Sequence, residues 1–302
     1  MTEFSVIIPT LNEEILLPNL LADLQAQTFR EFEVIVADAG SRDRTVEIAQ
    51  SMGARVVPGG MPAVGRNRGA KAANGNFLVF LDADTRIAPD FLQSVHDELE
   101  ERFLDLATCE IEPISRNPLD GLLHDFSNLA IKIGQFADPH APGFCIIISR
   151  RLFKRIGGFN ESLKLAEDHD LVKRASQFRP LRVLNSARVQ VSVRRLEKEG
   201  RVKLISKYVA VELYRILLGE IKTDIFKYEF GNFTHEQQAQ LDSKVRESQQ
   251  LIHHIRKEYT RLLQLSEGNL TSLPSDALEI IRGQFDALKE QMRAILKIIR
   301  RG

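Results

Sequence analysis

The sequence predicts an α/β fold with a mostly parallel β-sheet flanked by helices, followed by a helical extension at the C-terminus. Short apolar runs alternate with amphipathic stretches over the first hundred residues or so, which is the pattern of parallel sheets with helices on both faces. Beyond Thr234 the composition shifts to long polar stretches with narrow apolar seams. We therefore expect an α/β domain at residues 1–230 and a helical tail at residues 235–302.

Each expected element has its own signal. The strands are short apolar runs, expected at residues 4–8, 33–37, 54–57, 77–81, 106–111, 144–148 and 188–193. The helices show apolar residues at spacings of three and four, or a proline in the first turn, and are expected at residues 13–27, 44–52, 62–73, 89–103 and 167–177.

The tail begins with Thr234-His235-Glu236-Gln237, which fits a capping box at a helix start. Break signals at residues 266–274 divide it into two helices. The second helix carries a stripe of apolar residues at strict three and four spacing, namely Leu278, Ile281, Phe285, Leu288, Met292, Ile295 and Ile299. This pattern predicts a helical hairpin or coiled coil that folds on itself, packs on the main domain, or makes a homo-oligomer through residues 235–302.

Composition narrows the possible functions. The chain has 302 residues, and its 41 basic and 41 acidic side chains balance, which argues against a nucleic-acid partner. Its two cysteines, Cys109 and Cys145, lie in apolar segments and form no CxxC pair, so we expect buried thiols. No signal peptide or membrane-spanning segment is evident. We expect a cytoplasmic protein.

The most informative stretch is the apolar run 77–81, which leads directly into Asp82 and Asp84. A run this short predicts a buried strand, and ligands of open α/β sheets bind at the carboxyl ends of the strands. Two acids at that position repel each other unless a cation lies between them and an anion. The arrangement indicates a divalent metal that holds a diphosphate.

Polar side chains also follow the other early strands. Thr10 and Glu14 come after Pro9, which ends the first strand, and Asp38 ends the second. By themselves these residues could equally cap helices or stabilise turns. Arg66, in the glycine-flanked segment 65–71, could reach phosphate oxygens or could belong to a solvated helix face.

Taken in order, these motifs resemble those of the family 2 glycosyltransferases with the GT-A fold. The resemblance covers roughly residues 1–220 and rests on the following segments: 7–14, Asp38-Ala39-Gly40-Ser41, Arg66-Asn67-Arg68-Gly69, Asp82-Ala83-Asp84, Gly157-Gly158-Phe159-Asn160-Glu161 and Glu167-Asp168-His169-Asp170. It implies a GT-A, Rossmann-like domain and a metal-dependent, inverting transfer of a sugar from a nucleotide-diphosphate donor, UDP- or GDP-linked, to an acceptor hydroxyl.

The resemblance also implies roles for particular residues. Asp168 is the expected catalytic base, and Glu167 lies beside it near the acceptor or the metal shell. Asp84, with Asp82, is expected to hold Mn²⁺ or Mg²⁺ on the diphosphate. The residues expected to bind the nucleotide sugar are Pro9, Thr10, Glu14, Asp38, Arg66 and Asp82.

The sequence departs from the family pattern at two points. Many members have a metal-binding histidine after the Glu-Asp pair, but this chain has no histidine between His169 and His235. Arg194-Arg195 lies in roughly that region, and a cation there would stabilise the leaving diphosphate directly, so Arg194 is a further donor-site candidate. The second departure is Asp38-Ala39, where many members have two consecutive acids.

The acceptor is the least defined part of the prediction. In the family, the region of His140 and Gly143 faces the sugar and the acceptor, although a turn-stabilising role explains His140 as well. Tyrosines and basic residues at 198–228 are compatible with a packed helix, or with a peripheral membrane contact and a lipid-linked acceptor. The expected acceptor is a glycan or a lipid-linked sugar, met in the cytoplasm or at the inner membrane face.

Two other function classes stay open on sequence grounds. A nucleotidyltransferase that forms a nucleotide sugar also uses paired acids on an α/β domain, but it usually has an N-terminal glycine-rich phosphate loop, and residues 4–14 contain no glycine. A non-catalytic assembly subunit could use the helical tail alone. The acids at 82, 84 and 168 argue against this last alternative.

Overall fold

The computed structural model of the chain describes residues 2–115, 139–163 and 166–194, together with residues 120, 121, 124, 127, 128, 131, 132 and 135. Residues up to Val193 belong to one compact unit, and Arg194 begins a second. The predicted tail at 235–302, its role in oligomer formation and the predicted domain boundary near residue 230 lie outside the described residues.

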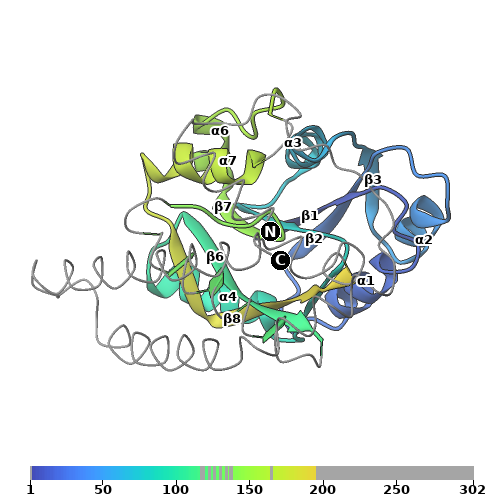
Figure 1. Ribbon diagram of the computed structural model, residues 1–302, viewed down its shortest axis with the longest axis horizontal. Coiled ribbons are helices and arrows are strands. Elements are labelled where there is room, and N and C mark those ends of the chain that lie inside the picture. Colours follow the sequence, from blue (N-terminus) through green and yellow to red (C-terminus); the bar gives the residue numbers. More distant parts are fainter. Residues whose placement is uncertain are drawn as a thin grey trace, which may run out of the picture. The chain divides into compact units, whose positions relative to one another are not determined.

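The described residues form strands and helices in alternation over the first half of the sheet (Figure 1). The strands are β1 (Phe4–Thr10), β2 (Phe32–Asp38), β3 (Arg55–Pro58), β4 (Phe77–Leu81), β5 (Thr85–Ile87), β6 (Leu106–Ile114), β7 (Cys145–Ser149) and β8 (Arg182–Ser192). The helices are α1 (Leu17–Gln25), α2 (Thr45–Ser51), α3 (Pro62–Ala72), α4 (Phe91–Glu101), α6 (Arg150–Arg155) and α7 (Glu167–Ser176).

These strands form one sheet in the order β3-β2-β1-β4-β7-β6-β8-β5. The first four strands are parallel, as the sequence predicts. The other half is mixed, because β7 runs antiparallel to both β4 and β6, β5 runs antiparallel to β8, and only β6 and β8 are parallel there. The sheet is therefore mixed, with its fully parallel part in the N-terminal half.

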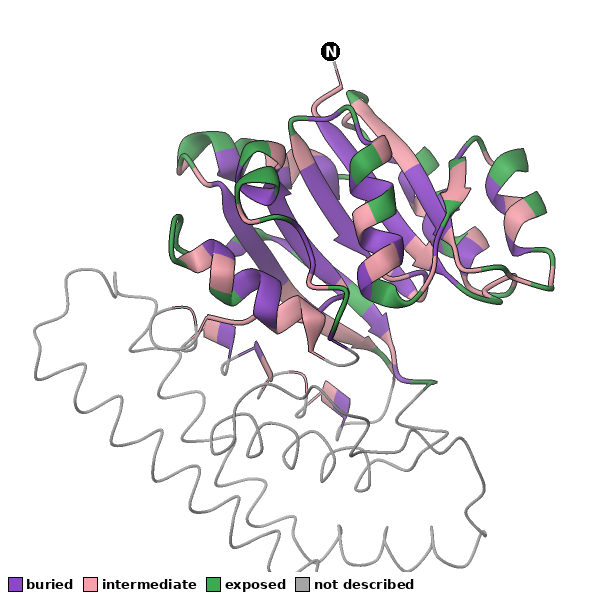
Figure 2. Cartoon of the chain, turned by 90° about the horizontal axis from the view of Figure 1, so that it is seen from above, coloured by how far each residue is buried: buried purple, intermediate pink, exposed green. Residues whose placement is uncertain are grey.

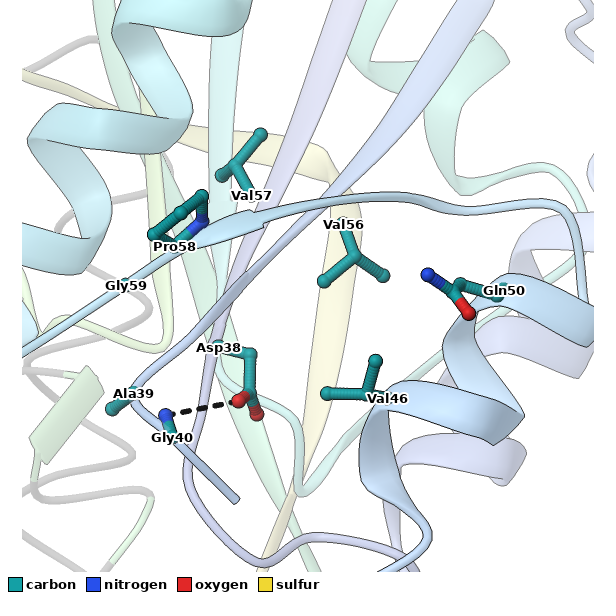
Figure 3. Close-up of a pocket in the computed structure, with 9 residues that line it drawn as sticks. All are labelled: Asp38, Ala39, Gly40, Val46, Gln50, Val56, Val57, Pro58 and Gly59. Atoms are coloured by element: carbon teal, nitrogen blue, oxygen red, sulfur yellow. Dashed lines mark hydrogen bonds between the residues drawn. The ribbon is translucent and has the colours of Figure 1, made fainter.

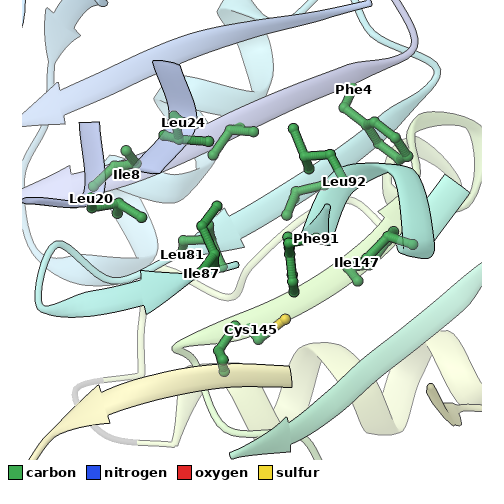
Figure 4. Packing of buried hydrophobic residues seen from close by; sticks show 14 of the residues in the cluster. Phe4, Ile8, Leu20, Leu24, Leu81, Ile87, Phe91, Leu92, Cys145 and Ile147 are labelled. Carbon is green, nitrogen blue, oxygen red and sulfur yellow. The ribbon is translucent and has the colours of Figure 1, made fainter. Parts of the chain in front are cut away.

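Two hydrophobic clusters cover the two faces of the sheet. One joins α1, α2 and α4 to one face, and it includes Leu20, Leu24, Phe91 and Leu92 (Figure 4). The other joins α3, α6 and α7 to the opposite face. Strand residues alternate between the clusters, as the two-residue period of a strand requires. Figure 2 shows the result, with central strands that are buried along most of their length and helices exposed on their outer sides.

Several details differ from the sequence prediction. Strand β8 begins at Arg182 rather than at residue 188, and β1 continues past Pro9 to Thr10. Helix α1 begins at Leu17 rather than at residue 13, and Ile15, an apolar residue within the predicted helix range, is 78% exposed. The sequence prediction missed the short strand β5. It also missed α6, whose first turn is capped by the Ser149 hydroxyl accepting from the backbone N–H of Leu152.

The two cysteines are buried free thiols, as predicted, and their Sγ atoms lie 3.0 Å apart between β6 and β7. Burial raises the pKa of the Cys109 thiol well above its usual range. Among the described residues, no helix combines the length and apolarity that a bilayer crossing needs.

Candidate active site

The candidate site lies where β1, β2 and β4 end. These strands are parallel neighbours with β1 in the middle, so the residues that follow them meet at one edge of the sheet. In the sheet, β2 lies on one side of β1 and β4 lies on the other side. This is the switch point at which open α/β sheets bind ligands.

Asp38, the last residue of β2, organises the first half of the site. Its Oδ1 accepts hydrogen bonds from the hydroxyls of Thr10 (3.1 Å) and Ser41 (2.5 Å). Its Oδ2 accepts from the backbone N–H groups of Gly40 and Ser41, both at 2.9 Å. A carboxylate has about four acceptor positions, so these donors occupy it fully. Asp38 therefore fixes the loop after β2, and its expected contact with the nucleotide sugar stays a prediction.

The loops after β1 and β2 are also joined to each other. The backbone N–H of Glu14 donates to Asp43 Oδ2 (3.1 Å), and Glu14 Oε2 accepts from the backbone N–H of Arg44 (3.0 Å). Asn12, whose φ of 55° is in the left-handed region, accepts from the N–H of Arg42. Glu14 thus has the structural role that the sequence left open as an alternative, and its expected contact with the nucleotide sugar stays a prediction.

A pocket of about 500 Å³ opens beside Asp38. It is lined by residues from the ends of β2 and β3 and from α2, including Val46, Gln50 and Val56. Figure 3 shows Val46 and Val56 beside the Asp38 carboxylate, with Gln50 to the right of them. The pocket combines apolar walls with a few polar groups, as is usual for small-molecule sites.

Asp82 organises the second half of the site. Because side chains alternate along β4, Asp82 follows Leu78 and Phe80 toward the face covered by α3 and α7. There its Oδ1 accepts a hydrogen bond from Arg66 Nη2 at 2.8 Å. Arg66 lies on α3 and is only 4% exposed, so the basic segment 65–71 is not simply a solvated helix face.

Glu167 and Asp168 come from the first turn of α7, where acidic residues interact favourably with the helix dipole. Glu167 Oε1 accepts from Arg66 Nη1 at 2.7 Å. Asp168 Oδ1 accepts from the backbone N–H of His169 at 2.8 Å, and the N–H of Gly143 donates to the same carboxylate. Arg66, Asp82, Glu167 and Asp168, which are far apart in the sequence, thus converge.

Burial dominates the electrostatics of the acid pair. It raises the pKa of Asp168, although Arg66 and the two backbone N–H groups oppose the shift. It also raises the pKa of Glu167, and the neighbouring charge of Asp168 adds to this effect. A carboxylate with a raised pKa is a stronger base than an exposed one. The site therefore contains a carboxylate suited to accept a proton.

Asn67 and Phe159 support the site, and the sequence prediction gave neither a role. Asn67 Nδ2 donates to the carbonyl of Phe159 (2.9 Å), and Asn67 Oδ1 accepts from the N–H of Phe159 (2.8 Å). The Phe159 ring in turn lies 5.6 Å from the Arg66 guanidinium carbon. The Gly157-Gly158-Phe159 motif was the signal in the sequence that could have indicated this contact. In the structure, this motif and the segment around Arg66 are joined by the two Asn67–Phe159 hydrogen bonds.

The described residues at this site could supply some of the ligands of a divalent cation, but not a complete set. Asp82 and Asp84 are both half-buried and offer the hard oxygen ligands that Mg²⁺ and Mn²⁺ prefer. Within residues 2–115, 139–163 and 166–194, however, no three His, Cys, Asp or Glu side chains group closely enough to hold a metal by themselves. A cation here would take its other ligands from a diphosphate and water, which is usual for Mg²⁺ on nucleotides.

The remaining predicted residues lie as follows. Pro9 pairs with Ala37 at the end of β1, next to the site. His140 is half-buried, and its ring centroid lies 5.2 Å from that of His169, beside Asp168. Arg194 is exposed and begins the second unit. Contacts of these residues with the sugar donor or the acceptor stay predictions.

Comparison with solved structures supports the fold. The structure superposes on Staphylococcus aureus TarS 1–349 in complex with UDP-GlcNAc over 63% of this chain and 58% of the TarS chain, with a TM-score of 0.52 and 26% identity. It superposes on the mannosyltransferase PcManGT from Pyrobaculum calidifontis, in complex with GDP-Man and Mn²⁺, over 96% of this chain and 82% of the PcManGT chain, with a TM-score of 0.57 and 18% identity. The predicted GT-A fold is confirmed.

Sequence comparison supports the family. An uncharacterized glycosyltransferase of Haemophilus influenzae is 29% identical over 57% of this chain and 62% of its own length. A PGL/p-HBAD biosynthesis glycosyltransferase of Mycobacterium bovis is 32% identical over 55% of this chain and 67% of its own length. The chain thus spans about three fifths of the first of these relatives. The sequence pattern described as "Glycosyl transferase family 2" matches residues 5–157, about half of the chain. This protein belongs to glycosyltransferase family 2.

Proposed function

We propose that this chain transfers a sugar from a nucleoside diphosphate donor to an acceptor hydroxyl, with inversion at the anomeric carbon. One observation carries the proposal: Asp82, after β4, and the acid pair of α7 converge on Arg66 at the switch point of the sheet. The similarity to TarS, whose structure holds UDP-GlcNAc, supports a nucleotide sugar as the substrate.

Each residue has a chemical role in this proposal. Asp168 takes the proton of the acceptor hydroxyl, whose oxygen attacks the anomeric carbon opposite the diphosphate; a single displacement of this kind inverts the configuration. The Asp38 loop and the pocket beside it receive the base and ribose. Asp82 and Asp84 would hold Mg²⁺ or Mn²⁺, which, when bound, supplies positive charge to the departing diphosphate.

The test is a turnover assay on the full chain. We expect release of nucleoside diphosphate from a UDP- or GDP-linked sugar when a glycan or lipid-linked acceptor is present, and loss of that release in excess EDTA. NMR of the product should show the anomeric configuration opposite to that of the sugar donor. Release of pyrophosphate from a nucleoside triphosphate and a sugar phosphate would instead identify a nucleotidyltransferase. The absence of both reactions across a donor panel would favour a non-catalytic subunit.

A further inference from the structure

Arg66 lies at the centre of the candidate site, facing the protein rather than solvent. Its Nη1 donates to Glu167 at 2.7 Å and its Nη2 to Asp82 at 2.8 Å. The Gly143 carbonyl lies 3.4 Å from Nη2, and the ring of Phe159 covers the guanidinium. Its Nε has no hydrogen-bond partner among the described residues. These contacts orient Arg66 toward the acids, whereas the sequence suggested ribose or phosphate.

The charge balance explains why a cation is needed there. Three carboxylates meet around one guanidinium, and two of them, Glu167 and Asp168, are adjacent on α7. Without Arg66 they would repel one another in a largely buried setting, where screening is weak. The planar guanidinium can bridge two carboxylates at fixed angles, which a lysine ammonium cannot do. Arg66 therefore links the end of β4 to the start of α7.

Gly143 leaves the space that this arrangement needs. A Cβ at this position would lie 2.8 Å from Arg66 Nη2 and 3.2 Å from Asp168 Oδ2. The φ of Gly143 is not in the left-handed region, so its backbone conformation does not itself demand glycine. The demand comes from the gap between Arg66 and Asp168, which a methyl group would enter.

We propose that Arg66 is a positioning residue that holds Asp82, Glu167 and Asp168 in their reactive arrangement, and that Gly143 is required because any side chain there displaces the Arg66 guanidinium. The proposal rests on the proposed glycosyl transfer. In that reaction Arg66 acts indirectly, by positioning the three acidic side chains. It also separates Arg66 from the residues that bind the nucleotide sugar directly.

The test is a double-mutant cycle of Gly143→Ala and Arg66→Lys, measured on the full chain. Misplacing the acids should lower kcat by roughly 10- to 100-fold in each single variant, because small displacements of catalytic groups are costly. In the Arg66→Lys background, the added methyl group no longer meets a guanidinium. Adding Gly143→Ala to that background should therefore lower kcat by less than about a further threefold. The affinity for UDP or GDP, measured by calorimetry, should change little in Gly143→Ala.

Two controls separate positioning from general damage. Gly121→Ala introduces a methyl group that meets no described residue within 4 Å, and Lys71→Gln removes a charge from the last turn of α3, the helix that carries Arg66. Both variants should keep the wild-type kcat. Additive losses in the cycle, or a weakened nucleotide affinity in Gly143→Ala with kcat unchanged, would overturn the proposal in favour of direct donor binding by Arg66.

Crystal structures keep this proposal distinct from the proposed function. In Gly143→Ala, Arg66 Nη2 should move out of hydrogen-bond reach of Asp82, and an unmoved guanidinium would refute the role given to Gly143. If the wild-type chain transfers no sugar from any donor, the proposed function fails, while the measured displacement still decides whether Gly143 makes room for Arg66.

Discussion

Asp168, the proposed catalytic base, has an environment that costs stability when the carboxylate is charged. Burial raises its pKa, so the folded protein holds the proton more tightly than the unfolded chain does. For such a group, the contribution to stability falls as pH rises through the unfolded pKa and up to the folded one. Wherever Asp168 is ionised in the folded protein, its buried charge therefore lowers the stability of the fold.

Asp168→Asn should abolish transfer and raise Tm at pH 7 to 8. The amide can still accept from the backbone N–H of His169, but it carries no charge to bury and does not repel Glu167. Each kcal/mol gained should raise Tm by about 2–4 °C in a domain of this size. Calorimetry of both forms between pH 4 and 8 measures this, and the gap should narrow as pH falls. If the Tm of Asp168→Asn at pH 8 is equal to or lower than that of the wild type, the attraction between Asp168 and Arg66 outweighs the cost of burying the Asp168 charge.

Gly158→Ala should destabilise the protein more than Gly157→Ala. Both glycines have a positive φ, 77° at Gly157 and 76° at Gly158, so either alanine is strained by roughly 1 kcal/mol. At Gly158 the new methyl group would also lie 2.7 Å from Asn67 Oδ1, whereas at Gly157 it meets no described residue within 4 Å. Chemical denaturation gives the free energy of unfolding of each variant. Because the backbone strain is common to both, the difference between them measures the cost of the close contact with Asn67. Equal losses would mean that Asn67 moves aside without cost.

At the scale of elements, Glu98 connects α4 to the start of β8. It is buried, and it accepts hydrogen bonds from the backbone N–H groups of Asn185 and Ser186, from the Ser186 hydroxyl and from Arg102. Burial works against its charge, but these hydrogen bonds outweigh burial and lower its pKa. This contact sits where the pairing of β6 with β8 shifts register.

Glu98→Gln should lower Tm at pH 7 and should matter less in acid. A carboxylate with a lowered folded pKa stabilises the protein above its unfolded pKa, and this contribution disappears as pH falls toward the folded one. The Tm difference from the wild type should therefore shrink between pH 6 and pH 3.5. Glu100→Gln, an exposed change on the same helix, is the control and should have little effect. A Tm difference that stays constant with pH would contradict the role of the charge.

The elements also show what the sequence can and cannot predict. The apolar runs of β1, β2 and β4 identified those strands within a residue or two, because buried strands need continuous apolar residues. The run at 144–148 identified β7 equally well, but nothing in such a run encodes direction, so its antiparallel pairing was not foreseen. Helix α6 was missed because its six residues are mostly basic and show no apolar period.

The candidate site also has parts that the sequence predicted and parts that it could not. The acids at 82, 167 and 168 were identified by their motifs, and the structure brings them together. The direction of Arg66 was not predictable, because a basic residue on a helix looks the same in the sequence whether it faces acids or a ligand. The saturation of Asp38 by four hydrogen bonds also depends on loop geometry that no local pattern specifies.

At the scale of the whole molecule, substrate and cation should stabilise the fold together. A ligand that binds only the folded state adds stability in proportion to the logarithm of its concentration, about 2.7 kcal/mol at 100 Kd. We expect UDP or GDP with Mn²⁺ to raise Tm more than the sum of the separate shifts, because the diphosphate would complete the ion's ligands. Differential scanning fluorimetry of the full chain measures this.

The matched variants for this experiment are Asp84→Asn and Asp90→Asn. The first should remove the cooperative shift. The second changes an exposed acid at the start of α4 that makes no capping hydrogen bond, and it should leave the shift intact. A nucleotide shift of the same size with and without Mn²⁺ would contradict a metal-linked site.

The direction of β7 affects how the specificity of such an enzyme can change. Because β7 runs opposite to β4, the loop before it, which carries His140 and Gly143, arrives at the same edge of the sheet that Asp82 leaves. That loop can gain or lose residues without altering the register of the parallel strands that hold Asp38 and Asp82. In the reaction we propose, changes in this loop away from Gly143 should alter the choice of acceptor alcohol without disturbing the residues that follow β1 and β2.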